Sequence, residues 1–222
     1  MTHFPQINAL PDAIFWDWDG TIVDSYQLLN KTHNSTLRSL GMPELKKGAF
    51  RDYFGKERMF IFSDIYGDQM ESAIEIFQDK VIENSHMITP MEGVDDVMSF
   101  LQENFVTLGL VTNKRRCFVE KELEHTGFNK FLPIVVCAAE ATQDKPYADP
   151  LLSAITQANM STDNHEIWYV GDTETDLKCA INAGCKSIFI KGHKDTIRLL
   201  EEYSPYISFD NYSAFKDFLV AI

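Results

Sequence analysis

Short apolar segments alternate with amphipathic ones along most of the chain. The apolar segments, rich in β-branched residues as buried strands are, cover 13–16, 107–111, 134–137, 167–170 and 187–190, with a weaker one at 206–209. The amphipathic segments, which have helical periodicity, cover 94–104, 115–126, 150–158, 173–183 and 196–203. This alternation predicts an α/β fold: a Rossmann-like, mostly parallel sheet with helices on both faces.

A long helical block separates the first predicted strand from the second. Its clearest stretch repeats apolar residues on one helix face, namely Met70, Ile74, Phe77 and Val81. A crossover between parallel strands needs only about a dozen residues, so the block is too long to be a simple connection. We therefore expect a small helical cap domain at 24–89, inserted after the first strand into a core domain formed by 1–23 and 90–222.

The bulk composition indicates a soluble globular protein. Of the 222 residues, 45% are hydrophobic and 24% are charged, which are ordinary values. No apolar run approaches the roughly 20 residues that a membrane-spanning helix needs, and the N-terminus lacks the pattern of a secretory signal. We expect a cytoplasmic protein without membrane contact. Four cysteines without a Cys-x-x-Cys pair are interpreted as buried thiols: Cys117, Cys137, Cys179 and Cys185.

The strongly acidic balance limits the partners. A net charge of −13 argues against binding to DNA or RNA, because that affinity comes largely from lysine and arginine. The same charge would also repel a small phosphorylated substrate. A phosphate-binding enzyme of this composition therefore needs a local cation.

Polar residues gather where the predicted strands end. Asp17, Asp19 and Gly20 follow the first strand, and the later strand ends or loops carry Thr112, Asn113, Lys145 and Asp172. In open α/β sheets the ligand lies at the carboxyl ends of the strands, so we expect these side chains to converge. Like carboxylates that close together need a compensating charge, and Mg²⁺ prefers such hard oxygen ligands.

The same residues suit phosphoryl transfer. The carboxylate of Asp17 could attack phosphorus and form an aspartyl-phosphate. Asp19, which points the same way if the chain stays extended, could protonate the leaving oxygen and later accept a proton from water. The side chains of Thr112, Asn113 and Lys145 could stabilise the charge on the transferring group.

The order of four motifs resembles a known family. DWDGT, LVTN, a KP-containing loop and GDTETD look like the motifs of the haloacid dehalogenase superfamily of phosphatases, and the helical insert is similar to the cap of its phosphoglycolate phosphatase-like branch. The third loop departs from the common KPxPxP form at Ala148. The resemblance implies a magnesium-dependent phosphatase with Asp17 as nucleophile, Asp19 as acid/base, and Thr112 and Lys145 as phosphate ligands. It also implies metal binding by Asp17, the backbone carbonyl of Asp19, and Asp172, supported by Asp176.

The substrate is less well defined than the chemistry. We expect a small phosphorylated metabolite and place Gly20, Asn113 and Lys56 among its binding residues. Gly55, Lys56 and Arg58 form a small basic patch of the cap, for which ordinary solvated charges are the favoured alternative. Trp18 is interpreted as structural, and Arg115 and Arg116 as the first turn of a helix. A monomer or a weak homodimer is the simplest assembly.

Several other functions remain open. A haloacid dehalogenase would usually lack Asp19, and a phosphonate hydrolase would need a cap lysine such as Lys56. A phosphosugar mutase of the β-phosphoglucomutase type would carry a histidine where this chain has Leu29. A non-catalytic binding or regulatory protein with the same fold would typically have lost a nucleophile or metal ligand, and this chain has not.

Overall fold

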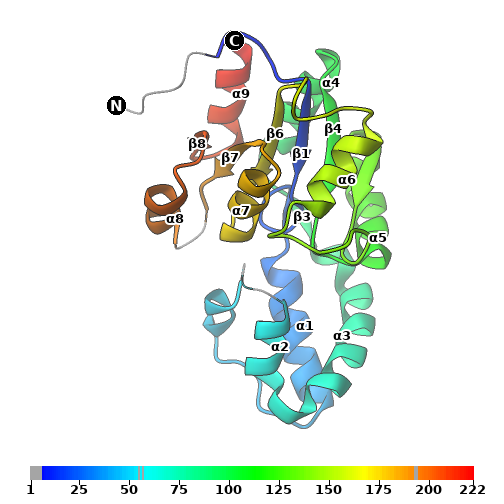
Figure 1. The fold of residues 1–222 in the computed structure, drawn as a ribbon. Coiled ribbons are helices and arrows are strands. Elements are labelled where there is room, and N and C mark those ends of the chain that lie inside the picture. Colours follow the sequence, from blue (N-terminus) through cyan, green and yellow to red (C-terminus); the bar gives the residue numbers. More distant parts are fainter. Residues whose placement is uncertain (1–6, 55, 57, 193–194) are drawn as a thin grey trace.

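The computed structural model describes residues 7–54, 56, 58–192 and 195–222. Figure 1 shows two parts, an α/β core and a group of helices extending from the carboxyl ends of its strands. The described core contains a parallel sheet with the strand order β5-β4-β1-β6-β7-β8. Its strands are β1 (Ala13–Trp16), β4 (Thr107–Val111), β5 (Ile134–Val136), β6 (Ile167–Gly171), β7 (Lys186–Ile190) and β8 (Ile207–Phe209). The predicted parallel sheet is confirmed.

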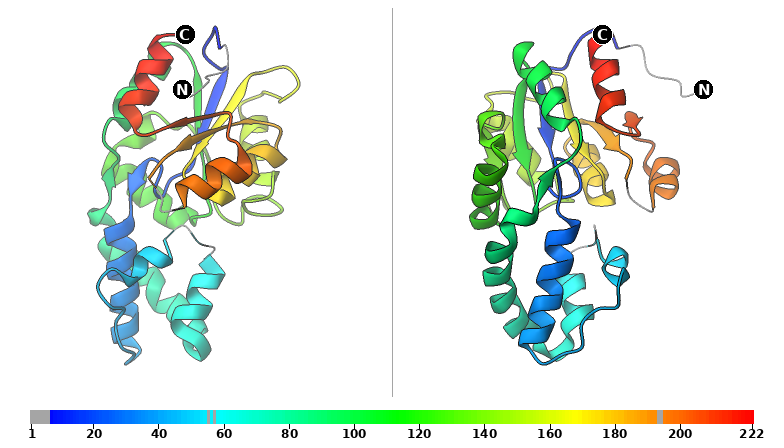
Figure 2. Two further views of the ribbon diagram at one scale, coloured as in Figure 1. Left: turned by 90° about the vertical axis from the view of Figure 1, so that its left-hand side faces the viewer. Right: turned by 180° about the vertical axis from the view of Figure 1, so that it is seen from behind.

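Helices cover both faces of this sheet, as predicted (Figure 2). They are α4 (Val94–Glu103), α5 (Arg116–Thr126), α6 (Asp149–Gln157), α7 (Glu174–Asn182), α8 (Thr196–Tyr203) and α9 (Tyr212–Val220). In β1, Ile14 and Trp16 belong to one hydrophobic cluster, whereas Ala13 and Phe15 belong to a second cluster on the opposite face. Burial on both faces explains why the central strand is apolar at every position.

Helix α9 and a small two-stranded pairing escape the sequence prediction. Tyr212 of α9 stacks on Trp16 with ring centroids 6.0 Å apart, and its hydroxyl donates a hydrogen bond of 2.8 Å to the Thr21 carbonyl. Strands β2 (Val23–Asp24) and β3 (Thr89–Pro90) pair in antiparallel fashion where the chain leaves and re-enters the core. Strands of two residues are too short to show a periodic pattern.

The helical insertion follows the first strands and contains α1 (Tyr26–Ser39), α2 (Arg58–Tyr66) and α3 (Met70–Asn84). Short 3-10 turns lie at Ala49–Asp52, Gly67–Gln69 and Ser85–Met87, and one in the core at Phe128–Lys130. Of the predicted apolar face of α3, Phe77 and Val81 are buried and Met70 and Ile74 pack against the same cluster. The insertion is therefore present, and its treatment as a separate domain with boundaries at 24 and 89 stays a prediction.

Two smaller expectations concern thiols and membranes. The four cysteines carry free thiols. Cys137 and Cys179 are buried as predicted, Cys185 is only partly buried, and Cys117 is exposed because it lies on the solvent side of α5. No helix in the described part of the chain is long and apolar enough to cross a membrane.

Candidate active site

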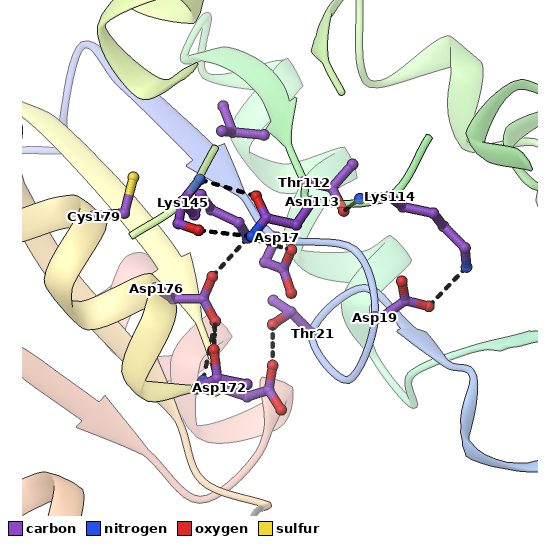
Figure 3. Close-up of polar contacts among 12 residues, drawn as sticks. Asp17, Asp19, Thr21, Thr112, Asn113, Lys114, Lys145, Asp172, Asp176 and Cys179 are labelled. Atoms are coloured by element: carbon purple, nitrogen blue, oxygen red, sulfur yellow. Dashed lines mark hydrogen bonds and ion pairs between the residues drawn. The ribbon is translucent and has the colours of Figure 1, made fainter. Parts of the chain in front are cut away.

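Asp17 lies directly after β1, at the carboxyl end of the central strand. Its backbone N–H donates to the Val170 carbonyl at 2.9 Å, which continues the pairing of β1 with β6. The side chain is buried, and its Oδ1 atom lies 2.6 Å from Lys145 Nζ. The predicted nucleophile is thus held by the sheet and by one lysine (Figure 3).

Lys145 is the centre of a buried network. Its ammonium group also lies 2.7 Å from Asp176 Oδ1 and donates a hydrogen bond of 2.9 Å to the Tyr169 hydroxyl. Asn113 holds the backbone of this lysine with two hydrogen bonds, accepting from Lys145 N at 2.9 Å and donating to Lys145 O at 2.8 Å. Asn113 therefore positions Lys145 in this structure, and its predicted contact with phosphate stays a prediction.

Asp172 and Asp176 reach the same place from β6 and α7. Thr21 donates a hydrogen bond of 2.8 Å to Asp172 Oδ1, and Asp176 Oδ2 accepts from the backbone N–H and the hydroxyl of Thr173 at the start of α7. At Gly171 a Cβ atom would lie 2.3 Å from Asp176 Cβ, so only glycine allows this close approach.

The geometry of the three carboxylates fits a divalent cation. Ligand oxygens of Asp17, Asp172 and Asp176 all lie within 4.8 Å of one another. At Gly20, a Cβ atom would lie 2.5 Å from Asp172 Oδ2, so glycine keeps space around that oxygen. Three carboxylates face one lysine, and Mg²⁺ would balance the remaining negative charge with ligands of the type it prefers.

The protonation of the group supports the same fit. Burial raises the pKa of Asp17 to about 7, although Lys145 works against this shift. Burial, together with the charges of Asp176 and Asp17, raises the pKa of Asp172 well above its ordinary value. Without a further cation the site therefore favours protonated carboxyl groups.

Asp19 lies outside this carboxylate cluster. The chain does not stay extended after Asp17 but turns, with the backbone N–H groups of Ile22 and Val23 both donating to the Trp18 carbonyl. The Asp19 side chain instead forms an ion pair with Lys114, at 2.8 Å (Figure 3). Metal binding through its backbone carbonyl and its acid/base role stay predictions.

Thr112, Gly20 and Lys56 make different contacts in the structure. Thr112 is buried at the end of β4, and its Oγ1 atom accepts a hydrogen bond of 3.1 Å from Lys114 N. Gly20 borders Asp172, as described above. Lys56 is exposed on the insertion, with its ammonium group 4.9 Å from the centre of the Phe60 ring, and Gly55 lies outside the described residues.

The remaining sequence interpretations concern basic residues and Trp18. Arg116 begins α5 as predicted, whereas Arg115 lies one residue before the helix, at its N-cap. Arg58 begins α2 and lies over the Phe62 ring. Trp18 is fully buried in the main hydrophobic cluster, which confirms a packing role.

Four residues of this region were missed by the sequence prediction: Thr21, Lys114, Glu122 and Tyr169. Thr21 lies within the DWDGT motif and Lys114 directly follows LVTN, so their position was an available signal. Glu122 is one acidic residue among several on a helix, and Tyr169 lies within an apolar strand. Nothing in the local sequence shows that the two side chains face charged groups.

Comparisons with known proteins show the family. The chain belongs to the haloacid dehalogenase-like hydrolases, whose family model matches residues 14–190. It is 25% identical to a phosphoglycolate phosphatase of Pseudomonas putida, over 96% of this chain and 82% of that protein. It is 26% identical to the pyrophosphatase PpaX of Bacillus velezensis, over 87% of this chain and 89% of that protein.

The fold agrees with solved structures. A haloacid dehalogenase-like hydrolase from Streptococcus pneumoniae superposes with a TM-score of 0.83 at 20% identity, covering 93% of this chain and 97% of that chain. At this identity the likeness concerns the fold alone.

Proposed function

We propose that this hydrolase is a magnesium-dependent phosphatase that hydrolyses a small phosphate monoester through an aspartyl-phosphate on Asp17. The observation that carries the proposal is the buried Asp17 carboxylate, paired with Lys145 and grouped with Asp172 and Asp176 at the carboxyl edge of the sheet. The relatives named for phosphoglycolate and pyrophosphate support a small phosphorylated metabolite as substrate.

The site residues divide the work of the reaction. An Asp17 oxygen attacks phosphorus while the bond between phosphorus and the ester oxygen breaks, and Asp19 supplies the proton to that oxygen. Water then attacks phosphorus, Asp19 takes its proton, and phosphate leaves Asp17. Lys145 keeps the attacking carboxylate in place from one side.

The other proposed site residues bind the metal ion or the substrate. Asp17, Asp172 and the Asp19 carbonyl would hold Mg²⁺, with Asp176 in support, and the bound ion would neutralise charge on the phosphoryl oxygens. Thr112 and Lys145, with Gly20 and Asn113 around them, would contact the phosphate. Lys56 would reach the substrate from the cap, whose residues 24–89 would cover the site and select the substrate.

Two further proposals concern the setting of the enzyme. We expect it to act in the cytoplasm, on the basis of its acidic, globular composition. A monomer or weak homodimer is sufficient for the chemistry, because every proposed catalytic residue comes from one chain. Size-exclusion chromatography with light scattering would test this assembly.

Hydrolysis of p-nitrophenyl phosphate tests the central proposal. We expect turnover by the wild type with Mg²⁺, none with EDTA, and none by Asp17→Asn under either condition. Asp163→Asn, at an exposed loop position, is the matched control and should keep full activity. Activity surviving in purified Asp17→Asn would contradict the covalent mechanism.

The role of Asp19 needs its own measurement. Asp19→Asn should suppress turnover far more than it weakens the binding of inorganic phosphate, because it removes a proton donor and no phosphate ligand. Equal losses in turnover and binding would point to a structural role.

A further inference from the structure

A second buried ion-pair network lies beside the candidate active site. Lys114 Nζ lies 2.8 Å from Asp19 Oδ1 and 2.7 Å from Glu122 Oε2. The same glutamate oxygen accepts a hydrogen bond of 2.6 Å from Trp18 Nε1. The network therefore joins the turn after β1, the loop after β4 and the middle of α5, and it ends at the proposed acid/base.

A buried glutamate at position 122 lowers the stability of the folded protein. It has no exposed surface, and burial raises the pKa of Glu122, against the opposing effect of Lys114. Its second oxygen, Oε1, has no hydrogen-bond partner within the described parts of the chain. Burying a carboxylate costs several kcal/mol even after the protein relaxes, so an apolar side chain would serve stability better here.

Lys114 is fixed from two sides. Its side chain is only 7% exposed, and burial lowers its pKa, but Asp19 and Glu122 more than offset this effect and raise the pKa of Lys114 above its ordinary value. The group is therefore a charged ammonium placed between the side chains of Asp19 and Glu122. Lys114 therefore has a second contact, at Glu122, that does not depend on the protonation of Asp19.

The anchoring reaches only one oxygen of Asp19. Oδ1 accepts the bond from Lys114, whereas Oδ2 has no hydrogen-bond partner among the residues that the structure describes. One oxygen is thus fixed while the other remains available for proton exchange. Correct placement of a proton donor is a large part of its catalytic effect.

We propose that Lys114, held by Glu122 and Trp18, is a positioning residue that aims the Asp19 carboxyl group at the leaving oxygen. This inference rests on the proposed phosphatase function. In the step concerned, the bond from Asp17 to phosphorus forms as the bond from phosphorus to the ester oxygen breaks. The Asp19 proton passes to that oxygen, which departs as an alcohol and leaves Asp19 as the carboxylate.

Leaving-group dependence distinguishes this role from general damage. An alkyl ester such as β-glycerophosphate needs protonation of its leaving oxygen, whereas the weakly basic p-nitrophenolate departs without it. The ratio of kcat/KM for the two esters therefore reports on Asp19, because kcat/KM covers the steps up to leaving-group departure.

The variants are Lys114→Met, Glu122→Gln and Trp18→Phe. Lys121→Met and Glu124→Gln, at exposed positions of α5 next to Glu122, are the controls. We expect Lys114→Met to lower kcat/KM for the alkyl ester about 10²-fold while changing that of p-nitrophenyl phosphate far less. Glu122→Gln should shift the ratio about tenfold, and Trp18→Phe less. Lys114→Arg, which keeps the charge, should restore most of the ratio.

The outcomes separate this inference from the proposed function. Equal losses for both esters in Lys114→Met and Glu122→Gln would overturn the positioning role and leave the phosphatase function intact. If Lys114→Met does not fold, the soluble variants Glu122→Gln and Trp18→Phe provide the test. An unchanged ratio of kcat/KM for the two esters in both of them would also overturn the positioning role. A wild type that hydrolyses neither ester would contradict the proposed function, and this inference with it.

Discussion

The core and the cap bury polar groups in opposite ways. At the carboxyl end of β1 the core buries Asp17, Asp172, Asp176 and Lys145 as a network of charges. The interior of the cap instead buries His33 among aromatic rings, with the rings of Phe50, Phe62, Tyr66 and Phe77 between 4.7 and 5.8 Å away. The core therefore buries ionisable groups at its strand ends, whereas the interior of the cap is packed with aromatic rings.

The two regions also respond to burial with opposite signs. Burial raises the pKa of Asp17 from 3.8 to about 7, whereas burial and the charge of Arg58 lower the pKa of His33 from 6.5 to about 3. Between pH 3.8 and about 7, Asp17 is protonated to a greater extent in the folded protein than in the unfolded chain. Its contribution to the stability of the core therefore falls as the pH rises. His33 binds fewer protons in the folded protein than in the unfolded chain. Its contribution to the stability of the cap therefore falls as the pH drops below about 6.5.

The largest effect should come from the carboxylates of the core that we propose as metal ligands. Asp172→Asn should lower kcat for p-nitrophenyl phosphate about 10³-fold, or about 4 kcal/mol, through loss of a metal ligand. The metal-free variant should melt no lower than the wild type, because asparagine replaces a carboxyl group whose raised pKa already favours its protonated form when no cation is bound. Asp79→Asn, an exposed aspartate of the cap, is the matched control and should keep full activity. A similar kcat for Asp172→Asn and wild type would contradict the proposed metal site.

In the cap, packing should dominate over chemistry. Phe77→Ala removes a buried ring that contacts His33 and Phe62, and should lower the free energy of unfolding by about 3 kcal/mol. Turnover of p-nitrophenyl phosphate by the folded protein should change little, since no reacting group is touched. Urea denaturation and kinetics at low temperature measure the two effects, with Glu75→Ala on the exposed face of α3 as control. A fall in kcat for Phe77→Ala as large as that for Asp172→Asn would contradict the view that this cap residue contributes to stability and not to the chemistry.

Metal binding should stabilise the core in a pH-dependent way. At about 100 times its Kd, Mg²⁺ should raise the free energy of unfolding by about 2.7 kcal/mol. At one fixed Mg²⁺ concentration, the gain should be larger near pH 8 than near pH 5.5, because the carboxylates must lose their protons to bind the ion and its Kd therefore rises at low pH. Thermal melting with Mg²⁺ or EDTA at both pH values tests this, and Asp172→Asn should show a much smaller gain. An equal gain at both pH values would contradict the raised pKa of Asp17.

The smallest effect should be the acid sensitivity of the cap. His33→Phe should weaken the dependence of stability on pH between about 6.5 and 4 by up to about 1.4 kcal/mol per pH unit. Tyr66→Phe is the control, because it removes the 2.8 Å hydrogen bond to His33 Nδ1 and keeps the titrating ring. Urea titrations at several pH values measure the slope. An unchanged slope in His33→Phe would show that this histidine is not the acid-sensitive group.

Much of the fold could be predicted because its signals are local. The strands of the sheet carry continuous apolar runs, and their ends fall within a residue or two of the expected positions, as at 107–111 and Ile134–Val136. Helix α9 was missed although Asn211, whose side chain accepts from Ala214 N, is a capping signal in the sequence. The β2–β3 pair could not be predicted, because its two strands lie far apart in the chain and are held by contacts between them.

The sequence by itself determined which residues stand at the strand ends, and parallel topology then brings Asp17, Thr112 and Asp172 to one edge of the sheet. Only the tertiary structure decided the partners of each charged group. Lys145 pairs with Asp17 and Asp176, whereas Lys114 pairs with Asp19 and with the buried Glu122. The physical reason is that the apolar pattern of a strand depends on residues that are neighbours in the sequence. An ion pair instead depends on the distance between two side chains that can be far apart in the chain.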